Sequence, residues 1–170
     1  MAGYTLSAKM LGFTQLQKAL ENAQPIVKQE LAKALNKAAN DVIQDVAQPG
    51  GAPHKTGRLW GSFHQGDPNS VTQFATQENL AAIVGTNLKY AKYQEQGTGI
   101  YGPHEQAFTI QAKNKKALYW EGASHPVKKV TIQGVRPKWF LKQALENVKP
   151  KLSEYLRIAS TRIIDQIKIA

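Results

Sequence analysis

The sequence contains no cysteine among its 170 residues. This absence excludes a disulfide framework, a thiolate nucleophile and a zinc site built on thiolates. Long hydrophobic runs are also missing, and no stretch approaches the ~20 consecutive apolar residues that a membrane-spanning helix requires. The first residues have no sustained apolar segment followed by a small-residue cleavage site, so we expect no signal peptide and synthesis in a cytoplasm.

Acidic residues are scarce, since 12 Asp and Glu stand against 22 Lys and Arg, which gives a net charge of +10. A surface of this charge attracts nucleic acid, acidic lipid or an acidic protein partner. The basic residues are scattered apart from clusters at 113–116 and 128–129, and neither cluster is interleaved with aromatic residues. Two interpretations therefore stay open: a solvated basic surface and a nucleic-acid-binding surface.

Two long segments with helical periodicity flank the middle of the chain. Apolar residues recur at spacings of three and four over 14–47 and again over 138–170. Because proline is unfavourable inside a helix, we expect a short helix to about residue 22 and a longer one that begins near residue 24, with Pro25 in its first turn. Pro150 likewise predicts a kink or a break near Lys149.

The region between these helices is rich in β-forming residues, with candidate strands at 70–76, 80–86, 107–112, 116–120 and 127–133. Their short connections suit antiparallel hairpins, because a parallel crossover needs a dozen or more residues. The order of helix, mixed strands and helix predicts a single α+β domain over residues 1–170. In it, an antiparallel β-sheet with hairpins packs against the long N-terminal helix and the long, kinked C-terminal helix.

The segment YAKYQEQGTGIYG at 90–102 contains Gly97-x-Gly99-x-x-Gly102, the glycine pattern of a dinucleotide-binding loop. Such a loop follows a strand and opens a helix. Here a short helix over 88–96 is expected before the glycines, and a strand-like run follows them. We therefore interpret Gly97 as a left-handed residue that ends the helix, and the glycines as a flexible exit of the chain.

Three polar residues near the short helices have specific expected roles. The hydroxyl of Thr56 is expected to cap a short helix after the helix-stopping run at 48–53, and Asn87 to cap the helix over 88–96. Glu95 lies in the last turn of that helix, where the macrodipole disfavours an acid by ~0.3–1 kcal/mol. Its side chain is either solvated or has a tertiary or intersubunit partner, for which Arg58 is the candidate.

The remaining residues form no pattern that calls for catalysis. The 4 histidines have no ligand spacing, and HEQAF at 104–108 has Phe108 where a zinc-protease helix needs its second histidine. Neither a Gly-x-Ser-x-Gly elbow nor a Gly-x4-Gly-Lys-Ser/Thr loop occurs. We therefore expect no enzymatic activity, no metal and no cofactor.

Three ordered motifs then become informative: APHKTGRLWGSF at 52–63, AIVGTNLKYAKYQEQGTG at 82–99 and VRPKWFLKQALENV at 135–148. In this order and spacing they resemble the tail-completion, or neck, proteins of long-tailed bacteriophages, a family often described as minor tail components. The motif residues that we select as structural or interface residues are Thr56, Gly57, Arg58, Leu59, Tyr90, Tyr93, Glu95, Gly97, Thr98, Gly99, Arg136, Pro137 and Phe140.

The resemblance implies a structural virion protein made in the cytoplasm of a bacterial host. It would form a homo-oligomeric ring, expected to be hexameric, that completes the tail and joins it to the head. Its implied partners are head-closure or connector, tail-tube and tail-terminator proteins, with no membrane. DNA would pass through the ring without sequence-specific binding, so we expect Lys and Arg mainly on partner-facing or outer surfaces. A tail-terminator ring and a basic nucleic-acid-binding module are the alternatives.

Residues 98–134 are the candidate for a projecting arm rich in hairpins. An isolated hairpin is marginal in water, so an arm of this kind gains stability when it packs on a neighbouring subunit. We therefore expect this segment to carry much of the ring contact. A sheet that is wholly internal to one subunit is the alternative.

Overall fold

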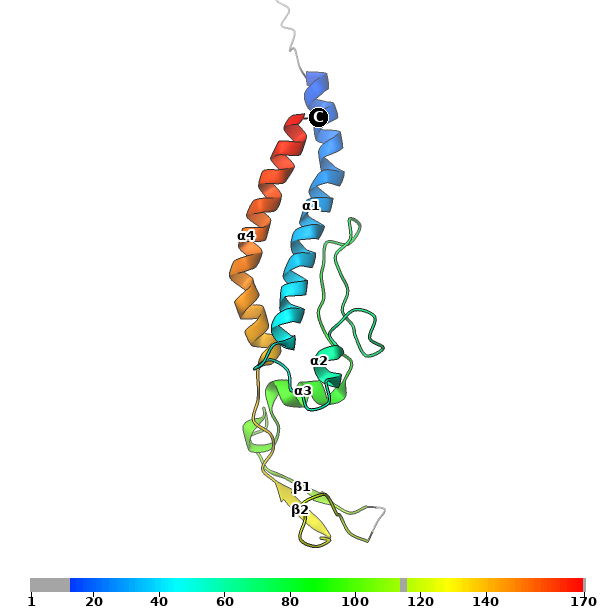
Figure 1. The fold of residues 1–170 in the computed structure, drawn as a ribbon, viewed down its shortest axis with the longest axis vertical. Coiled ribbons are helices and arrows are strands. Elements are labelled where there is room, and N and C mark those ends of the chain that lie inside the picture. Colours follow the sequence, from blue (N-terminus) through cyan, green and yellow to red (C-terminus); the bar gives the residue numbers. More distant parts are fainter. Residues whose placement is uncertain (1–12, 114–115, 170) are drawn as a thin grey trace, which may run out of the picture.

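The computed structural model describes residues 13–113 and 116–169; the prediction about a signal peptide falls on residues outside this part. The fold is α+β, as predicted, with two long antiparallel helices and a small antiparallel sheet beyond one end of the pair (Figure 1). In chain order the elements are α1 (Phe13–Ala47), α2 (Arg58–Gly61), α3 (Lys89–Gln96), the 3-10 helix η1 (Gly99–Tyr101), β1 (Phe108–Gln111), β2 (Lys129–Ile132) and α4 (Phe140–Ile169).

Both long helices continue through a proline, so the predicted break before Pro25 and the alternative of a break near Lys149 are wrong. Proline removes one backbone donor and costs ~3 kcal/mol or more inside a helix. Pro25 and Pro150 are both exposed, so water can reach the carbonyl that loses its donor. Packing of α1 along α4 offsets the cost, and α4 is bowed instead of broken (Figure 1).

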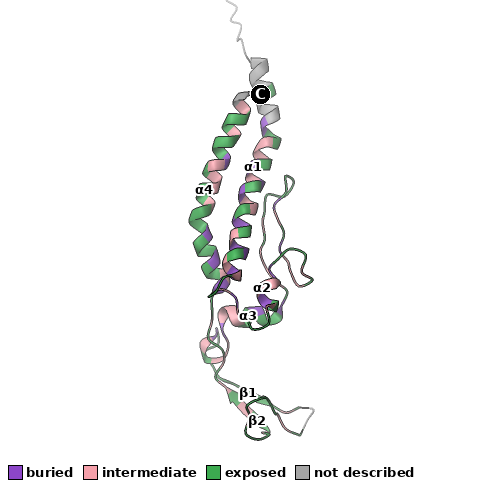
Figure 2. Ribbon diagram, viewed as in Figure 1, coloured by how far each residue is buried: buried purple, intermediate pink, exposed green. Residues whose placement is uncertain are grey.

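The core lies at the lower end of the helix pair, where α2 and α3 meet α1 and α4 (Figure 2). The rings of Phe63 and Phe140 are fully buried there and meet edge to face, with centroids 6.0 Å apart. Its buried members are Ala38, Val42, Val46, Ala52, Leu59, Phe63, Leu88, Ala91, Phe140, Ala144 and Val148. This cluster joins the three sequence motifs, because each of them contributes residues to it.

A polar contact joins the two long helices above this core. The hydroxyl of Tyr155 on α4 donates a hydrogen bond to the Asp41 carboxylate on α1 over 2.6 Å. This bond, together with some burial, raises the pKa of Tyr155 above its ordinary value. The ammonium of Lys37 lies 4.4 Å from the centre of the Tyr155 ring. The contact fixes the register of the helix pair at its middle.

The candidate strands at 70–76 and 80–86 run antiparallel but form only isolated bridges, Ser70 to Thr86 and Gln73 to Ile83. The side chain of Asn36 on α1 makes the hydrogen bonds to Ala75 that a neighbouring strand would otherwise make. The amide group of Asn36 accepts from the backbone N–H of Ala75 over 2.6 Å and donates to its carbonyl over 2.9 Å. These runs are therefore fixed to α1 as an irregular hairpin and are not regular strands.

Within the part of the chain that the structure describes, the regular sheet consists of β1 and β2, paired antiparallel with Phe108 opposite Ile132. The run at 116–120 contributes only a bridge between Leu118 and Val127. The sheet is thus smaller than predicted, and it projects away from the two long helices instead of packing along them (Figure 1). The described residues of the segment at 98–134, called the arm below, lie beyond the end of the helix pair (Figure 1).

Candidate functional site

Glu95 joins the end of α3 to the beginning of α4. Its carboxylate accepts hydrogen bonds from the backbone N–H groups of Leu141 and Lys142, both over 3.0 Å. The first N–H groups of a helix have no acceptor within the helix, and the macrodipole favours an anion at that end. The expectation of a tertiary partner is confirmed, but that partner is the start of α4 and not Arg58.

Backbone bonds complete this junction. The N–H of Lys138 donates to the carbonyl of Gln94 over 2.9 Å, and the N–H of Trp139 donates to the carbonyl of Glu95 over 3.1 Å. The carbonyls at the end of a helix lack donors, so these bonds satisfy α3 as well. Trp139 has a positive φ of 49°, a conformation that is unfavourable for a bulky residue. The junction therefore holds a strained backbone in place.

Both predicted side-chain caps are wrong. Helix α2 begins after Gly57, whose φ is 72°, and the exposed Thr56 makes no side-chain bond to the helix. At α3 the hydroxyl oxygen of Thr86 accepts from the N–H of Leu88 over 3.2 Å, and no such bond comes from Asn87. Gly57 adopts a left-handed backbone at little cost, which moves the start of α2 past Thr56.

The glycines after α3 pack against the chain that returns from the arm. The N–H of Thr98 donates to the carbonyl of Val135 over 2.9 Å, while the N–H of Val135 donates to the Thr98 hydroxyl over 3.0 Å. A Cβ on Gly99 would overlap the carbonyl of Gln133, and one on Gly134 would overlap the carbonyl of Thr98. The interpretation as a flexible exit is wrong, since two chain segments cross here in direct backbone contact.

Gly97 ends α3 as predicted and has a positive φ of 77°, but the predicted left-handed helical conformation is wrong. Its ψ of 175° is extended, a combination that is essentially confined to glycine. A Cβ at this position would come within 2.8 Å of the carbonyl oxygens of Tyr101 and Val135. A strand, β1, and not a helix follows the glycines, so the arrangement of a dinucleotide-binding loop is absent from this segment.

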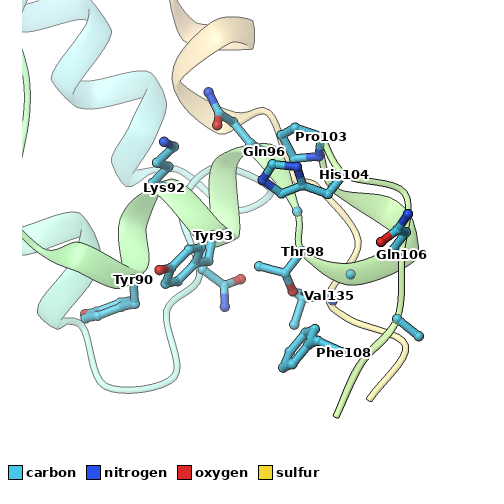
Figure 3. A pocket seen from close by; sticks show the side chains of 15 residues that line it. Tyr90, Lys92, Tyr93, Gln96, Thr98, Pro103, His104, Gln106, Phe108 and Val135 are labelled. Carbon is cyan, nitrogen blue, oxygen red and sulfur yellow. Dashed lines mark hydrogen bonds between the residues drawn. The ribbon is translucent and has the colours of Figure 1, made fainter. Parts of the chain in front are cut away.

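A groove of about 780 Å³ opens between α3 and the base of the arm (Figure 3). One side of this tyrosine groove is formed by Tyr90 and Tyr93 of α3, which are 38% and 55% exposed, and the other side by Phe108 and Val135. The glycine crossing contributes Gly97, Thr98 and Gly99. Its lining is mostly apolar and, among the residues described for it, includes the cationic Lys92 but no acid.

The other selected residues lie outside the tyrosine groove. Leu59 and Phe140 are buried in the core, and the Arg136 guanidinium lies 5.2 Å from the centre of the Tyr101 ring. Pro137 lies against Gly97, within 2.9 Å of where a Cβ would stand. Thr56 and Arg58 are exposed and are not among the residues of the groove. The structure thus gathers the second and third motifs around one junction and leaves part of the first apart.

Sequence reasoning missed Phe108 and Val135 as groove residues. The alternation of apolar and polar residues in the run at 107–112 places Phe108 and Ile110 on one face of a strand. That pattern could have identified Phe108 as a surface residue with an apolar side chain. No local pattern reveals that Val135 lies against Thr98, because the two are 37 positions apart and are joined only by the crossing.

The tyrosine groove suits apolar and aromatic side chains. Across residues 13–113 and 116–169, no group of His, Cys, Asp and Glu could hold a metal ion. None of the helices in this part is long and apolar enough to cross a membrane. Aromatic walls with one cation and no acid resemble a protein-binding surface, since aromatic residues are enriched at such interfaces.

Comparison with protein families gives a match over part of the chain. Residues 14–97 match the model of the HK97-gp10-like family, described as "Bacteriophage HK97-gp10, putative tail-component". Over these residues the chain is similar to the HK97-gp10-like family. The matched segment includes the first motif and the second motif up to Gly97, directly before the arm. Searches of curated proteins and of solved structures gave no significant match.

The match to the HK97-gp10-like family confirms the resemblance at the level of the phage tail. The protein is a bacteriophage tail component, a structural role, and as such a part of the virion. The matched residues include the tyrosines of α3 together with Glu95 and Gly97, so the α3 side of the junction lies within the family segment. The arm and α4 lie beyond it.

Proposed function

We propose that this tail component assembles as a homo-oligomeric ring at the head–tail junction, with six copies as the expected number, and that the ring completes the tail and joins it to the head. One observation carries the proposal: the arm has an apolar face that the described residues of the single chain leave partly exposed. The match to the HK97-gp10-like family supports a role in the tail, and the exposed apolar face of the arm supports assembly with further copies.

The two faces of the β1–β2 hairpin differ in polarity. Phe108 pairs with Ile132 and Ile110 with Val130, so these four apolar side chains share one face. Phe108 and Ile110 are 41% and 40% exposed. A two-stranded hairpin is marginally stable alone and needs a third strand or a packing partner. A neighbouring subunit supplies that partner in the proposed ring.

The position of the arm favours a ring over a closed dimer. The arm projects beyond one end of the helix pair (Figure 1), so it reaches a surface that differs from its own. Contacts between two different surfaces are heterologous, and they generate a ring when the rotation between copies closes. In such a ring every arm is covered and every receiving surface is filled.

The basic charge suits partner contacts in this proposal. Exposed lysines occur on the arm at positions 113, 116, 128 and 129. A bore lined with lysine would hold DNA phosphates and hinder passage, because such contacts supply most non-specific affinity for DNA. We therefore place these lysines toward partner proteins or the outer surface. The partners are head-closure or connector, tail-tube and tail-terminator proteins, and DNA passes through without sequence-specific binding.

Removal of the arm tests the ring. Residues 103–132 are replaced by a short glycine linker, which retains the glycine crossing, and the mass of the assembly is measured by native mass spectrometry. The expected result is a folded monomer with the helical content of the shortened chain. A shortened protein that still forms the wild-type oligomer would refute the role of the arm.

Deletion of the gene in its phage tests the position in the tail. Separate filled heads and finished tails in the lysate are the result expected for a joining ring. Abnormally long tails would instead identify the alternative, a tail terminator. Fully infectious particles that lack the protein would refute both.

A net charge of +10 favours a second candidate from another class, a nucleic-acid-binding module. That candidate requires tight binding to free double-stranded DNA, with an affinity that falls steeply between low and moderate salt. The ring proposal expects no complex that survives physiological salt. Fluorescence anisotropy with a labelled duplex over a series of salt concentrations distinguishes the two.

A further inference from the structure

The arm ends in a turn that exposes two neighbouring aromatic residues. Tyr119 and Trp120 are 70% and 47% exposed. Leu118 and Val127, just before and after this turn, exchange two backbone hydrogen bonds of 2.8 and 3.0 Å. Gly122 follows with a φ of 90°, which permits the tight reversal. The hydrogen bonds between Leu118 and Val127 therefore hold the turn that exposes the two aromatic side chains.

The same chain carries a surface that accepts aromatic groups. The tyrosine groove lies at the base of the arm and is walled by Tyr90 and Tyr93, with Phe108 opposite (Figure 3). All three side chains are more than one third exposed. Aromatic residues dominate the energetics of protein interfaces, where they fill desolvated pockets and pair with aromatic groups of the partner. One subunit thus exposes both an aromatic turn and a groove that can bind aromatic side chains.

We propose that the Tyr119–Trp120 turn of one copy docks into the tyrosine groove of the neighbouring copy. This inference rests on the proposed ring and names the surfaces that build it. Charge supports a second copy as the occupant: Glu121 directly follows Trp120, and the described lining of the groove contains Lys92 and no acid. Docking brings this acid toward that cation, which favours one orientation of the turn.

The two surfaces differ, so the contact between copies is heterologous. Each copy offers one aromatic turn and one groove, and a closed ring uses all of them. An isologous dimer in which the two turns met each other would leave both grooves open, whereas a reciprocal dimer, in which each turn fills the groove of the other copy, would use all of them and would limit the crosslinked ladder below to dimers. The proposal therefore predicts that a copy with a defective turn and a copy with a defective groove still join once.

The absence of cysteine provides a direct test, because an introduced thiol is the only one in the chain. Lys92→Cys and Glu121→Cys are made as separate single variants, mixed and oxidised. The expected product is a covalent dimer that contains one copy of each variant. A matched control pairs Lys92→Cys with Ser153→Cys, an exposed position on α4, and is expected to give no such dimer.

Both cysteines in one chain extend the test. The expected product is a ladder of covalent oligomers whose largest member gives the number of copies in the ring. If the wild type forms rings but the cysteine variants give no crosslink between positions 92 and 121, the docking proposal is overturned and the ring proposal stands. A wild-type protein that stays monomeric at every concentration would overturn both.

Complementary variants test the direction of the contact. Trp120→Ser and Tyr93→Ser are each expected to weaken assembly by at least about tenfold in the dissociation constant. Both residues are exposed, so the circular dichroism of each variant should match the wild type. A mixture of the two variants should form heterodimers and no rings. The opposite result has two parts: Trp120→Ser still forms rings, and phage that carry this variant have tails that fail to join heads. That result would overturn docking between copies and assign the turn to a contact with another virion protein.

Discussion

Replacement of Glu95 by alanine removes the carboxylate that accepts from the first N–H groups of α4. The N–H of Leu141 is partly buried and that of Lys142 is exposed. Water replaces the acceptor at Lys142 but only in part at Leu141. The backbone bonds from positions 138 and 139 to residues 94 and 95 stay, so the junction is weakened and not abolished.

The expected loss of stability follows from two effects. A lost N-terminal cap costs about 0.5–2 kcal/mol, and a lost negative charge beside a helix start costs about 0.3–1 kcal/mol. The two overlap, because one carboxylate supplies both. We expect Glu95→Ala to lower the free energy of unfolding by about 1–2 kcal/mol, and Glu95→Gln, which keeps one oxygen acceptor, by roughly half of that.

Urea unfolding followed by circular dichroism measures this change. The midpoint should fall without a change in the slope, since the exposed surface is the same. For a chain of this size the melting temperature should drop by about 2–4 °C per kcal/mol. The matched control is Glu146→Ala, which removes an exposed acid of α4 for which the described residues give no hydrogen bond or ion pair to α3.

A Glu95→Ala variant as stable as Glu146→Ala would refute the role of the carboxylate at the start of α4. A double-mutant cycle separates this role from the sequence-based alternative, in which Arg58 is the partner. Groups without contact give additive changes within about 0.3–0.5 kcal/mol. We expect Glu95→Ala and Arg58→Ala to be additive within that range, and a larger coupling energy would restore Arg58 as a partner.

Three further predictions concern the packing. Gly99→Ala should destabilise the base of the arm by more than about 1 kcal/mol and speed limited proteolysis there, whereas Gly61→Ala, which has free space around it, should be neutral or slightly stabilising. Phe140→Ala should cost about 3–5 kcal/mol in urea unfolding, because the ring is fully buried. Since the pKa of Tyr155 is raised by Asp41, the stability from this bond is present below pH about 10 and lost as the pH rises through the raised pKa. The decline of the wild type in alkaline unfolding titrations should therefore be smaller in Tyr155→Phe.

The long helices could be predicted because their apolar period extends over many turns. Proline positions misled the prediction at Pro25, where a local cost of ~3 kcal/mol was outweighed by packing along α4. The runs at 70–76 and 80–86 have strand-forming sequences, yet a side chain of α1, Asn36, satisfies the backbone of Ala75. A partner so distant in sequence leaves no local signal.

The candidate site was predicted in part. The position of Glu95 at the unfavourable end of α3 indicated a partner, and one exists. The partner was misidentified because backbone N–H groups carry no residue type that a sequence can reveal. Gly97 was predicted from its place after a helix, whereas the overlap that a side chain on Gly99 would have with Gln133 depends on the returning chain. The tyrosine groove required both segments together.

The crossing of residues 97–99 with 133–135 has a consequence for the diversity of such proteins. Both ends of the arm leave the body at one place, where backbone bonds join them. Loop closure costs only about 0.6 kcal/mol per doubling of length, so the body tolerates inserts of very different size there. Replacement of the arm alone can thus give the subunit a new contact with neighbouring proteins of the virion, while the two long helices and their core stay unchanged.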